Sequence, residues 1–459
     1  MTDSAFASLA IPQAQLDNLG SLGYHSMTAI QAAALPLALA GKDLVAQAKT
    51  GSGKTAAFGL PLLARLNPRD FGTQALILCP TRELASQVAA EIRRLARYQQ
   101  NIKVVTLCGG QSIGPQIGSL EHGAHVVVGT PGRIGDHLRK NTLSLDRVNC
   151  VVLDEADRML EMGFVDDIEA IIGHTPSVRQ TLLFSATFPD NILAMSARFQ
   201  QSPQRISVES QHDSPQIDQH FYICQSQGRL EGLAKLLAHY RPDAAVVFCN
   251  TKQLVREVCL YLEQQGVSAM ALHGDMEQRD RDQVLVRFRQ QACRVLVATD
   301  VAARGLDIDE LPAVVNFELP RSSEIYVHRI GRTGRAGRGG LALSLFTDAE
   351  RYRLDGIADL QQREVTFEAI DTVAWSDSAM PPPAFVTLCI AGGRRDKVRP
   401  GDVLGALTGE AGIDGAAVGK INVMDGVTYV AISTDLADTA LGRLLNGKIK
   451  GRKFKVRRL

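Results

Sequence analysis

The sequence of 459 residues lacks the marks of a membrane or secreted protein. No apolar run approaches the roughly 18 to 20 residues that cross a bilayer. The segment Met1–Ser4 has neither the basic nor the apolar region of a secretory signal. The eight cysteines form no C-x-x-C pair and mostly lie in apolar runs, so we expect buried reduced thiols rather than disulfides or zinc ligands. These features predict a soluble cytoplasmic protein.

A net charge of either sign is also nearly absent, because 50 Lys/Arg residues face 49 Asp/Glu residues. The charges are nevertheless unevenly distributed along the chain. Residues 381–459 hold 13 Lys/Arg and 7 Asp/Glu, which leaves 37 against 42 for residues 1–380. Seven of the cations lie within residues 448–459. This asymmetry indicates a polyanion-binding module that is attached to a nearly neutral body.

Short apolar runs rich in β-branched residues alternate with helical stretches between about residues 40 and 347. Buried strands separated by helices are typical of parallel sheets that are covered on both faces. The polar stretch Ser207–Gln216 divides the runs into two series, and Pro381–Pro383 is typical of a stiff spacer. The predicted domains are residues 1–206, residues 217–370 and residues 384–459, with a linker over residues 371–383.

A glycine-rich segment follows the strand-like run Asp43–Ala46 and matches most of the P-loop pattern. Such a loop cradles phosphates with its N–H groups, while Lys54 reaches the β and γ phosphates and the Thr55 hydroxyl holds magnesium. By itself the segment could also be a glycine-rich turn without a ligand. The candidate phosphate-binding residues are Ala48, Lys49, Thr50, Gly51, Ser52, Gly53, Lys54 and Thr55.

Two acidic residues, Asp154 and Glu155, end the apolar run Cys150–Leu153. Without a P-loop we would interpret them as a solvated helix start, which acidic residues favour. Beside a P-loop they are suited to nucleotide chemistry, with Asp154 as the magnesium ligand and Glu155 as the general base toward water.

Together with further motifs in residues 6–335, these segments resemble the DEAD-box family of ATP-dependent RNA helicases. The resemblance implies an α/β fold of two tandem RecA-like parallel-sheet P-loop domains, with ATP and Mg²⁺ as cofactors and RNA as the partner. In the family a glutamine reads the adenine edge and an aromatic residue packs on the base, roles that fall on Gln31 and Tyr24. The adenine-side residues so implied are Phe6, Tyr24, Thr28 and Gln31.

The remaining motifs imply roles in both domains. In the family two arginines of the second domain act as fingers on the γ-phosphate, and an aspartate there binds the ribose; these are Arg332, Arg335 and Asp307. The residues that couple hydrolysis to strand separation are Asp157, Ser185, Thr187 and His328. The RNA-backbone contacts are Pro80, Thr81, Arg82, Gly110, Thr130, Arg133, Gly274, Arg281 and Thr299.

Residues 384–459 predict the order strand, helix, strand, strand, helix, strand, which is typical of a small α+β, RRM-like RNA-binding domain. Its stacking signature is poor, because Tyr429 is the one aromatic residue in the segment Val427–Ile432. We therefore expect basic loops to contribute to recognition. The candidate RNA contacts of this module are Arg394, Arg395, Lys397, Tyr429, Lys450, Arg452, Lys453 and Lys455.

A helicase core followed by such a module resembles the bacterial DbpA-type subfamily. That resemblance implies binding to a hairpin in the peptidyl-transferase region of 23S rRNA, on pre-50S particles during assembly of the large ribosomal subunit. The sequence indicates no membrane and no obligate protein partner. Three alternatives stay open: an ATP-dependent RNA clamp or annealing factor, a generic RNA chaperone, and a DNA-acting ATPase.

Overall fold

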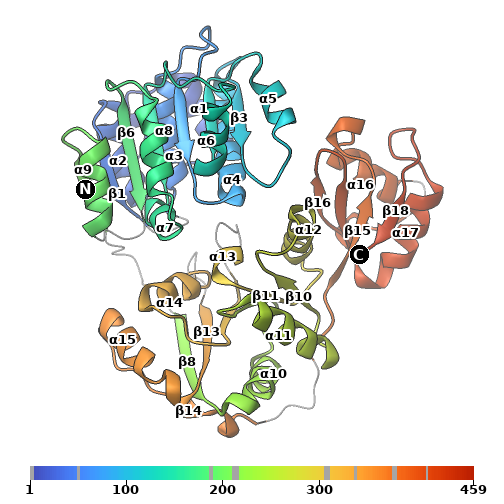
Figure 1. The fold of residues 1–459 in the computed structure, drawn as a ribbon. Coiled ribbons are helices and arrows are strands. Elements are labelled where there is room, and N and C mark those ends of the chain that lie inside the picture. Colours follow the sequence, from blue (N-terminus) through green and yellow to red (C-terminus); the bar gives the residue numbers. More distant parts are fainter. Residues whose placement is uncertain are drawn as a thin grey trace. The chain divides into compact units, whose positions relative to one another are not determined.

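The computed structural model (Figure 1) describes residues 5–48, 52–185, 190–208, 217–303, 311–334, 339–374, 380–409 and 412–459. The chain forms two compact units, the first with Met1–Gln211 and the second with His212–Arg304 and Ile308–Leu459. None of the helices found among the described residues combines the length and the apolar character that a membrane crossing requires.

The described part of the first unit contains a seven-stranded parallel sheet with the strand order β3-β4-β2-β5-β6-β1-β7. The strands are β1 Leu44–Gln47, β2 Ala75–Leu78, β3 Val104–Leu107, β4 Val126–Gly129, β5 Cys150–Asp154, β6 Gln180–Ser185 and β7 Gln204–Ser207. The helices are α1 Gln13–Ser21, α2 Ala29–Leu39, α3 Lys54–Ala64, α4 Arg82–Leu95, α5 Gly114–Leu120, α6 Pro131–Arg139, α7 Ala156–Glu161, α8 Val165–Gly173 and α9 Asp190–Phe199.

Both faces of this sheet are buried, because alternate side chains of each strand point to opposite sides. In β2, Ala75 and Ile77 join the core formed with α2, α3 and α4. Leu76 and Leu78 join the core on the other face, formed with α6, α7, α8 and α9. Figure 1 shows these helices on the two sides of the sheet.

The second unit contains a second sheet, with the order β10-β11-β9-β12-β13-β8-β14 within the described residues. Its strands are β8 Ile217–Ile223, β9 Ala245–Phe248, β10 Ala269–Leu272, β11 Val295–Ala298, β12 Ala313–Asn316, β13 Gly340–Phe346 and β14 Glu368–Ala369. Its helices are α10 Arg229–Tyr240, α11 Lys252–Gln264, α12 Gln278–Arg289, α13 Asp300–Ala303, α14 Ser323–Ile330 and α15 Tyr352–Gln361. All of its strand pairs are parallel, which confirms the predicted pair of parallel-sheet domains.

The C-terminal module of the second unit is a small antiparallel α+β domain. Its sheet has the order β16-β17-β15-β18, with α16 and α17 packed against the core of Leu388, Ile390 and Val430. The predicted RRM-like succession of elements is confirmed. The bounds are β15 Phe385–Ile390, α16 Pro400–Thr408, β16 Val418–Val423, β17 Thr428–Ser433, α17 Ala437–Asn446 and β18 Val456–Arg458.

The other face of the module sheet contacts helix α12 of the second parallel-sheet domain. Val286 packs there with Cys389 and Tyr429. The buried side chain of Gln290, which follows α12, accepts a hydrogen bond from Thr387 Oγ1 at 2.8 Å. Its amide nitrogen lies 2.9 to 3.3 Å from three acceptors of the module, which are Lys420 O, Asn422 Oδ1 and Tyr429 O.

We predict that Gln290→Ala loosens this contact, because buried polar groups of the module would lose their partner. Each unsatisfied group costs about 1–3 kcal/mol. Spin labels at the exposed positions Leu260 and Leu445 should show a broader distance distribution in the variant. The exposed Gln264 provides the control, since Gln264→Ala should leave the distribution narrow. An unchanged distribution in Gln290→Ala would show that the apolar contact alone holds the module.

Candidate nucleotide and RNA sites

The nucleotide candidates of the first unit gather at the carboxyl edge of the sheet. Strand β6 lies between β1 and β5, and Gln47 pairs in register with Ser185 while Asp154 pairs with Phe184. Since parallel strands end at the same edge, the P-loop, the acidic segment and Ser185 come together there. A hydrogen bond joins two of them directly, because Ala48 N donates to Ser185 O at 2.9 Å.

The adenine-side segment contacts the P-loop through Gly53. Thr28 and Gln31 form a capping box at the start of α2, and Gln31 Nε2 donates to Gly53 O at 3.1 Å. Gly53 has φ 90°, a left-handed backbone conformation that favours glycine. A Cβ at this position would lie 2.5 Å from Gln31 Nε2, so the glycine also permits the close approach of the glutamine.

The two predicted nucleotide-binding aromatics lie beside each other. The rings of Phe6 and Tyr24 are 6.2 Å apart and meet edge to face. Tyr24 OH donates a hydrogen bond to Glu91 Oε1 on α4 at 2.8 Å, and burial is the main cause that raises the pKa of Tyr24. The phenol therefore stays neutral and holds the ring in place.

Two buried polar atoms of the site have no hydrogen-bond partner within the described structure: Lys54 Nζ and Asp154 Oδ1. Buried polar atoms in folded proteins usually have a hydrogen-bond partner, and a bound ligand is a suitable partner for these two. Burial raises the pKa of Asp154 to about 6, while the charge of Lys54 acts in the opposite direction. A phosphate at the ammonium and a hydrated divalent cation at the carboxylate match this donor set, and Thr55 is half-buried next to Lys54.

Glu155 occupies a strained backbone position. Its φ of 54° and ψ of 52° are left-handed, which costs an L-residue other than glycine roughly 1–2 kcal/mol. The side chain is buried and forms an ion pair with Arg158, in which Arg158 Nη1 lies 3.0 Å from Glu155 Oε2. Asp157, also buried, accepts from Arg158 N at 3.0 Å. Strain of this kind tends to occur at functional sites.

The predicted RNA contacts of the first unit lie at the other half of the same edge, after β2, β3 and β4. Pro80 is buried, and the Thr81 hydroxyl caps α4 by accepting from Leu84 N at 3.3 Å. Arg82 Nη1 donates to Gly109 O at 2.7 Å. Gly110 has φ 70°, and a Cβ there would overlap the Arg82 guanidinium, so glycine is required beside it.

Helix α6 contributes the last predicted RNA contacts of this unit. Thr130 is its N-cap residue, and Arg133 Nη2 donates to Gln111 O at 2.9 Å. Arg133 Nε lies 3.5 Å from Asp136, but neither Nε nor Nη1 has a hydrogen-bond partner within the described structure. The guanidinium is therefore only partly engaged by hydrogen-bond acceptors of the described structure.

In the second unit, sequence reasoning missed the role of Arg329, which is almost fully buried. All five of its N–H groups find acceptors, and its guanidinium lies 5.1 Å from the centre of the Phe248 ring. The bonds, of 2.7 to 3.1 Å, go to both Asp300 carboxylate oxygens, Asn316 Oδ1, Glu318 O and Asn250 Oδ1. The sequence shows four cations in this motif but not how deeply each is buried or what it contacts.

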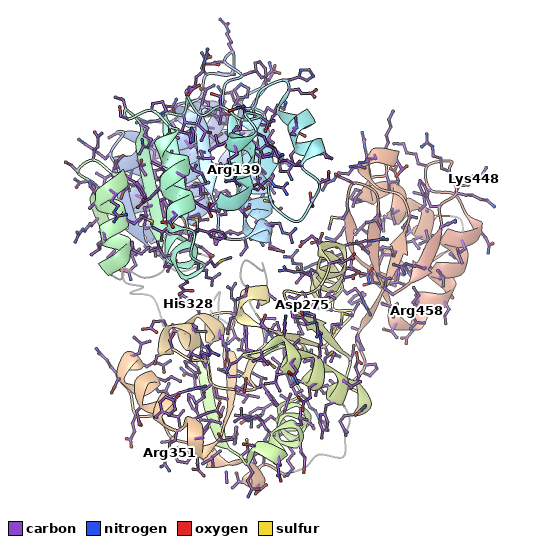
Figure 2. The ribbon with its side chains drawn as sticks, in the orientation of Figure 1. Arg139, Asp275, His328, Arg351, Lys448 and Arg458 are labelled. Atoms are coloured by element: carbon purple, nitrogen blue, oxygen red, sulfur yellow. The ribbon has the colours of Figure 1, made fainter. Side chains whose placement is uncertain are left out.

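The other described candidates of this unit lie on the segments that follow β10, β11 and β12. Arg332 is buried after α14, and His328 is half-buried on it, as labelled in Figure 2. Thr299 follows β11 and accepts from Ala302 N at 3.4 Å. Gly274 is exposed after β10, and Arg281 is half-buried in the first turn of α12. They too lie near the carboxyl edge of their sheet.

The predicted basic contacts of the module form one exposed surface, which we call the basic patch: Arg394, Arg395, Lys397, Lys450, Arg452, Lys453 and Lys455. Two contacts bring its segments together, since Lys450 Nζ donates to Lys397 O at 3.2 Å and Ala391 N donates to Lys455 O at 2.8 Å. Gly392 allows this approach, because a Cβ there would lie 2.2 Å from the Phe454 ring. Lys448 and Arg458 lie on the same module in Figure 2.

Tyr429 differs from the other expected RNA contacts. The side chain is 4% exposed, since it packs against Val286 of α12, and burial raises its pKa. Its ring offers no exposed face to a base in this structure, so the structure does not support an RNA contact at this position.

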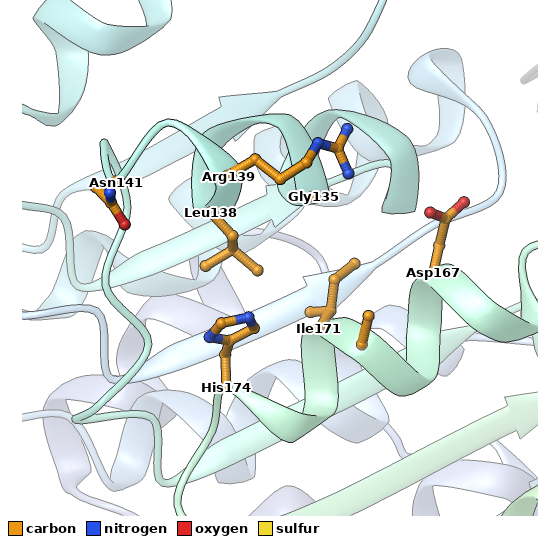
Figure 3. A pocket seen from close by; sticks show the side chains of 8 residues that line it. Gly135, Leu138, Arg139, Asn141, Asp167, Ile171 and His174 are labelled. Carbon is orange, nitrogen blue, oxygen red and sulfur yellow. The ribbon is translucent and has the colours of Figure 1, made fainter.

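Six candidates lie outside the described residues: Lys49, Thr50, Gly51, Thr187, Asp307 and Arg335. A pocket of about 230 Å³ between α6 and α8 (Figure 3) contains none of the candidates. Its lining includes Leu138, Arg139, Ile171 and His174.

Comparison with known proteins agrees with this arrangement. Residues 28–195 match the DEAD/DEAH box helicase family, residues 228–337 match the helicase conserved C-terminal domain, and residues 387–458 match the DbpA RNA binding domain. The ATP-dependent RNA helicase DbpA of Escherichia coli K12 is 54% identical over 99% of this chain and all of its own length. The chain belongs to the DEAD-box family of ATP-dependent RNA helicases.

Other relatives share the core of this DEAD-box helicase. CshA of Geobacillus kaustophilus is 44% identical over 79% of this chain and 78% of its own. Among solved structures, the yeast Dbp5 L327V variant bound to RNA and ADP BeF3 is 30% identical, with a TM-score of 0.73 over 81% of this chain and 97% of its own. ATP use, RNA binding and helicase activity are thereby confirmed at the level of the family.

We predict that Gly53→Ala weakens ATP binding about 5- to 30-fold, because the left-handed backbone costs roughly 1–2 kcal/mol and the Cβ displaces Gln31. Titration of a fluorescent ATP analogue would measure the change. Gly118→Ala is the control, since a Cβ there meets nothing within 4 Å. Unchanged affinity in Gly53→Ala would contradict the importance of the Gln31–Gly53 contact.

We predict different outcomes for two neighbouring arginines. Arg329→Ala should destabilise the second unit by about 3–5 kcal/mol, because it leaves the half-buried Asp300 carboxylate and the buried Asn316 Oδ1 without their partner. Arg332→Ala should instead lower kcat for ATP hydrolysis more than it raises KM. Thermal unfolding and steady-state kinetics of both variants would measure these effects. A pure KM effect in Arg332→Ala would remove this residue from the finger role.

Proposed function

We propose that this DEAD-box helicase locally unwinds short RNA duplexes in large-subunit assembly, and that its module directs it to a hairpin of 23S rRNA. The observation that carries the proposal is the module itself. Residues 387–458 match the DbpA RNA binding domain, and the similarity to E. coli DbpA extends over both full chains. The buried free cysteines further support a reducing, cytoplasmic site of action.

In the proposed mechanism, ATP lies at the carboxyl edge of the first sheet. Thr55 and Asp154 would hold Mg²⁺, which when bound neutralises charge on the β and γ phosphates. Lys54 contacts the same phosphates, and Glu155 accepts a proton from the water that attacks the γ-phosphorus as the bond to ADP breaks. Arg332, from the second unit, stabilises charge that develops in the transition state. Hydrolysis thus requires groups from both units.

The proposed RNA and ATP residues come from both units, so binding of both ligands would favour a closed state. The candidates of the helicase core, such as Arg82, Arg133 and the loop N–H groups, are suited to bind the RNA backbone. Contacts of this kind do not depend on the RNA sequence. A single strand held along these residues would exclude its partner strand. Hydrolysis would then weaken the closed state and release the RNA.

Selection of a particular RNA must then come from a part of the chain outside the helicase core. The basic patch of the module is suited to this role. Its seven cations are exposed on loops, where they can reach phosphates and unpaired bases of a hairpin. The module sheet, which other RRM-like domains use for stacking, is occupied here by α12 at Tyr429. Recognition through the patch therefore leaves the contact with α12 intact.

We predict that replacing Lys450, Arg452, Lys453 and Lys455 by alanine removes the preference for hairpin-containing rRNA. Generic RNA should still stimulate ATP hydrolysis, because the core residues are unchanged. A plot of log affinity against log salt concentration should become shallower by up to about 3. With fewer phosphate contacts, fewer counterions are released on binding. The measurement is ATPase activation by hairpin rRNA and by a generic duplex across a salt series.

Alanine at four exposed arginines, Arg205, Arg241, Arg351 and Arg363, provides a control of equal charge change outside the module. Deletion of residues 384–459 is a less clean test than the substitutions, because it would expose Val286 and leave Gln290 unpaired. If the patch variant keeps the full preference for hairpin rRNA, the basic patch does not direct the protein to this RNA. Strand release with ATP but not with a non-hydrolysable analogue would distinguish unwinding from clamping.

A further inference from the structure

Three carboxylates and two cations crowd the end of strand β5. Asp154, Glu155 and Asp157 are 3%, 5% and 5% exposed. Buried charges require compensation, since water cannot stabilise them there. Lys54 compensates the charge of Asp154, because the ammonium partly offsets the rise that burial causes in the pKa of this carboxylate. The second cation, Arg158, pairs with Glu155 instead.

The pair between Arg158 and Glu155 is shielded from solvent on both sides. Each side chain is 7% exposed, and Arg158 Nη1 lies 3.0 Å from Glu155 Oε2. The three-residue spacing allows the contact, because Glu155 caps α7 and Arg158 lies on its first turn. A charge-assisted hydrogen bond of this length restricts the carboxylate to one orientation.

Glu155 lies at the junction of β5 and α7 in a left-handed backbone conformation. Among the described residues, Arg158 supplies the side-chain hydrogen bond to its carboxylate. The contact with Arg158 engages one carboxylate oxygen, Oε2. The second oxygen, Oε1, takes no part in this contact and is the better placed of the two to receive a proton.

We propose that Arg158 is a positioning residue for ATP hydrolysis, which holds the Glu155 carboxylate so that Oε1 faces the attacking water. The inference rests on the proposed role of Glu155 as the general base. As the water oxygen bonds to the γ-phosphorus, its proton passes to Oε1, and the bond to the ADP oxygen breaks with its electron pair. Arg158 touches neither water nor nucleotide in this step and acts through Glu155.

The test compares Arg158→Met and Arg158→Lys in the full chain, with RNA-stimulated ATP hydrolysis as the readout. In Arg158→Met, kcat should fall at least about tenfold, part of the factor of about 10²–10⁴ that a positioned base contributes. KM for ATP and ATP-dependent RNA affinity should change less than about twofold. Arg158→Lys keeps the charge and should recover kcat to within about threefold of the unsubstituted protein.

Two results for Arg158→Met would overturn the proposal: an unchanged kcat, or parallel losses in kcat, ATP affinity and RNA affinity, which indicate a merely structural ion pair. Arg198→Met, which removes an exposed ion pair with Glu169, is the control and should leave kinetics unchanged. If Arg158→Met does not fold, Arg158→Gln replaces it, and an unchanged kcat in that variant would contradict the proposal.

Glu155→Gln separates this inference from the proposed function. It should abolish hydrolysis and preserve ATP-dependent RNA binding. If Glu155→Gln retains turnover, the assignment of the base is wrong irrespective of Arg158. If it stops turnover while Arg158→Met leaves kcat intact, Glu155 remains the base and only the positioning role of Arg158 is lost.

Discussion

The parallel arrangement of strands is the constraint on which both parallel-sheet domains depend. Because the described strands of the first sheet end at the same edge, segments more than a hundred residues apart meet there, such as those of Ala48 and Ser185. Strands β1, β6 and β5 bring the nucleotide candidates together, and β2, β4 and β3 bring the RNA candidates to the adjoining half. One edge can thus serve two ligands, and α4 borders both, since it begins at Arg82 and meets Tyr24 through Glu91.

Buried charge determines which groups at these edges are available for chemistry. Every N–H group of the Arg329 guanidinium donates a hydrogen bond to the protein, so this residue holds loops of the second unit together. Lys54 Nζ and Asp154 Oδ1 are buried without hydrogen-bond partners in the described structure, so a ligand can still engage both atoms. Arg158 and Glu155 lie between these extremes, since their ion pair engages one carboxylate oxygen.

The module shows how packing can redirect a familiar fold. An antiparallel sheet with helices on one face leaves its other face open. Here α12 covers that face at Cys389 and Tyr429, and the polar atoms of Gln290 satisfy the backbone and side chains beneath it. The charged residues of the basic patch remain exposed because their hydration is too favourable for burial.

The sequence by itself determined the fold class, the succession of elements in the module and most candidate positions, because strand periodicity and P-loop chemistry are local properties. It also identified Gly53 and Glu155 by type and spacing. Only the tertiary structure decided that Gln31 contacts Gly53, that Arg329 is a buried scaffold and that Tyr429 faces α12. The sequence pattern cannot reveal these contacts, since an arginine or a tyrosine looks the same in the sequence whether its side chain is exposed or buried. Its role depends on which distant side chains supply acceptors or cover its ring.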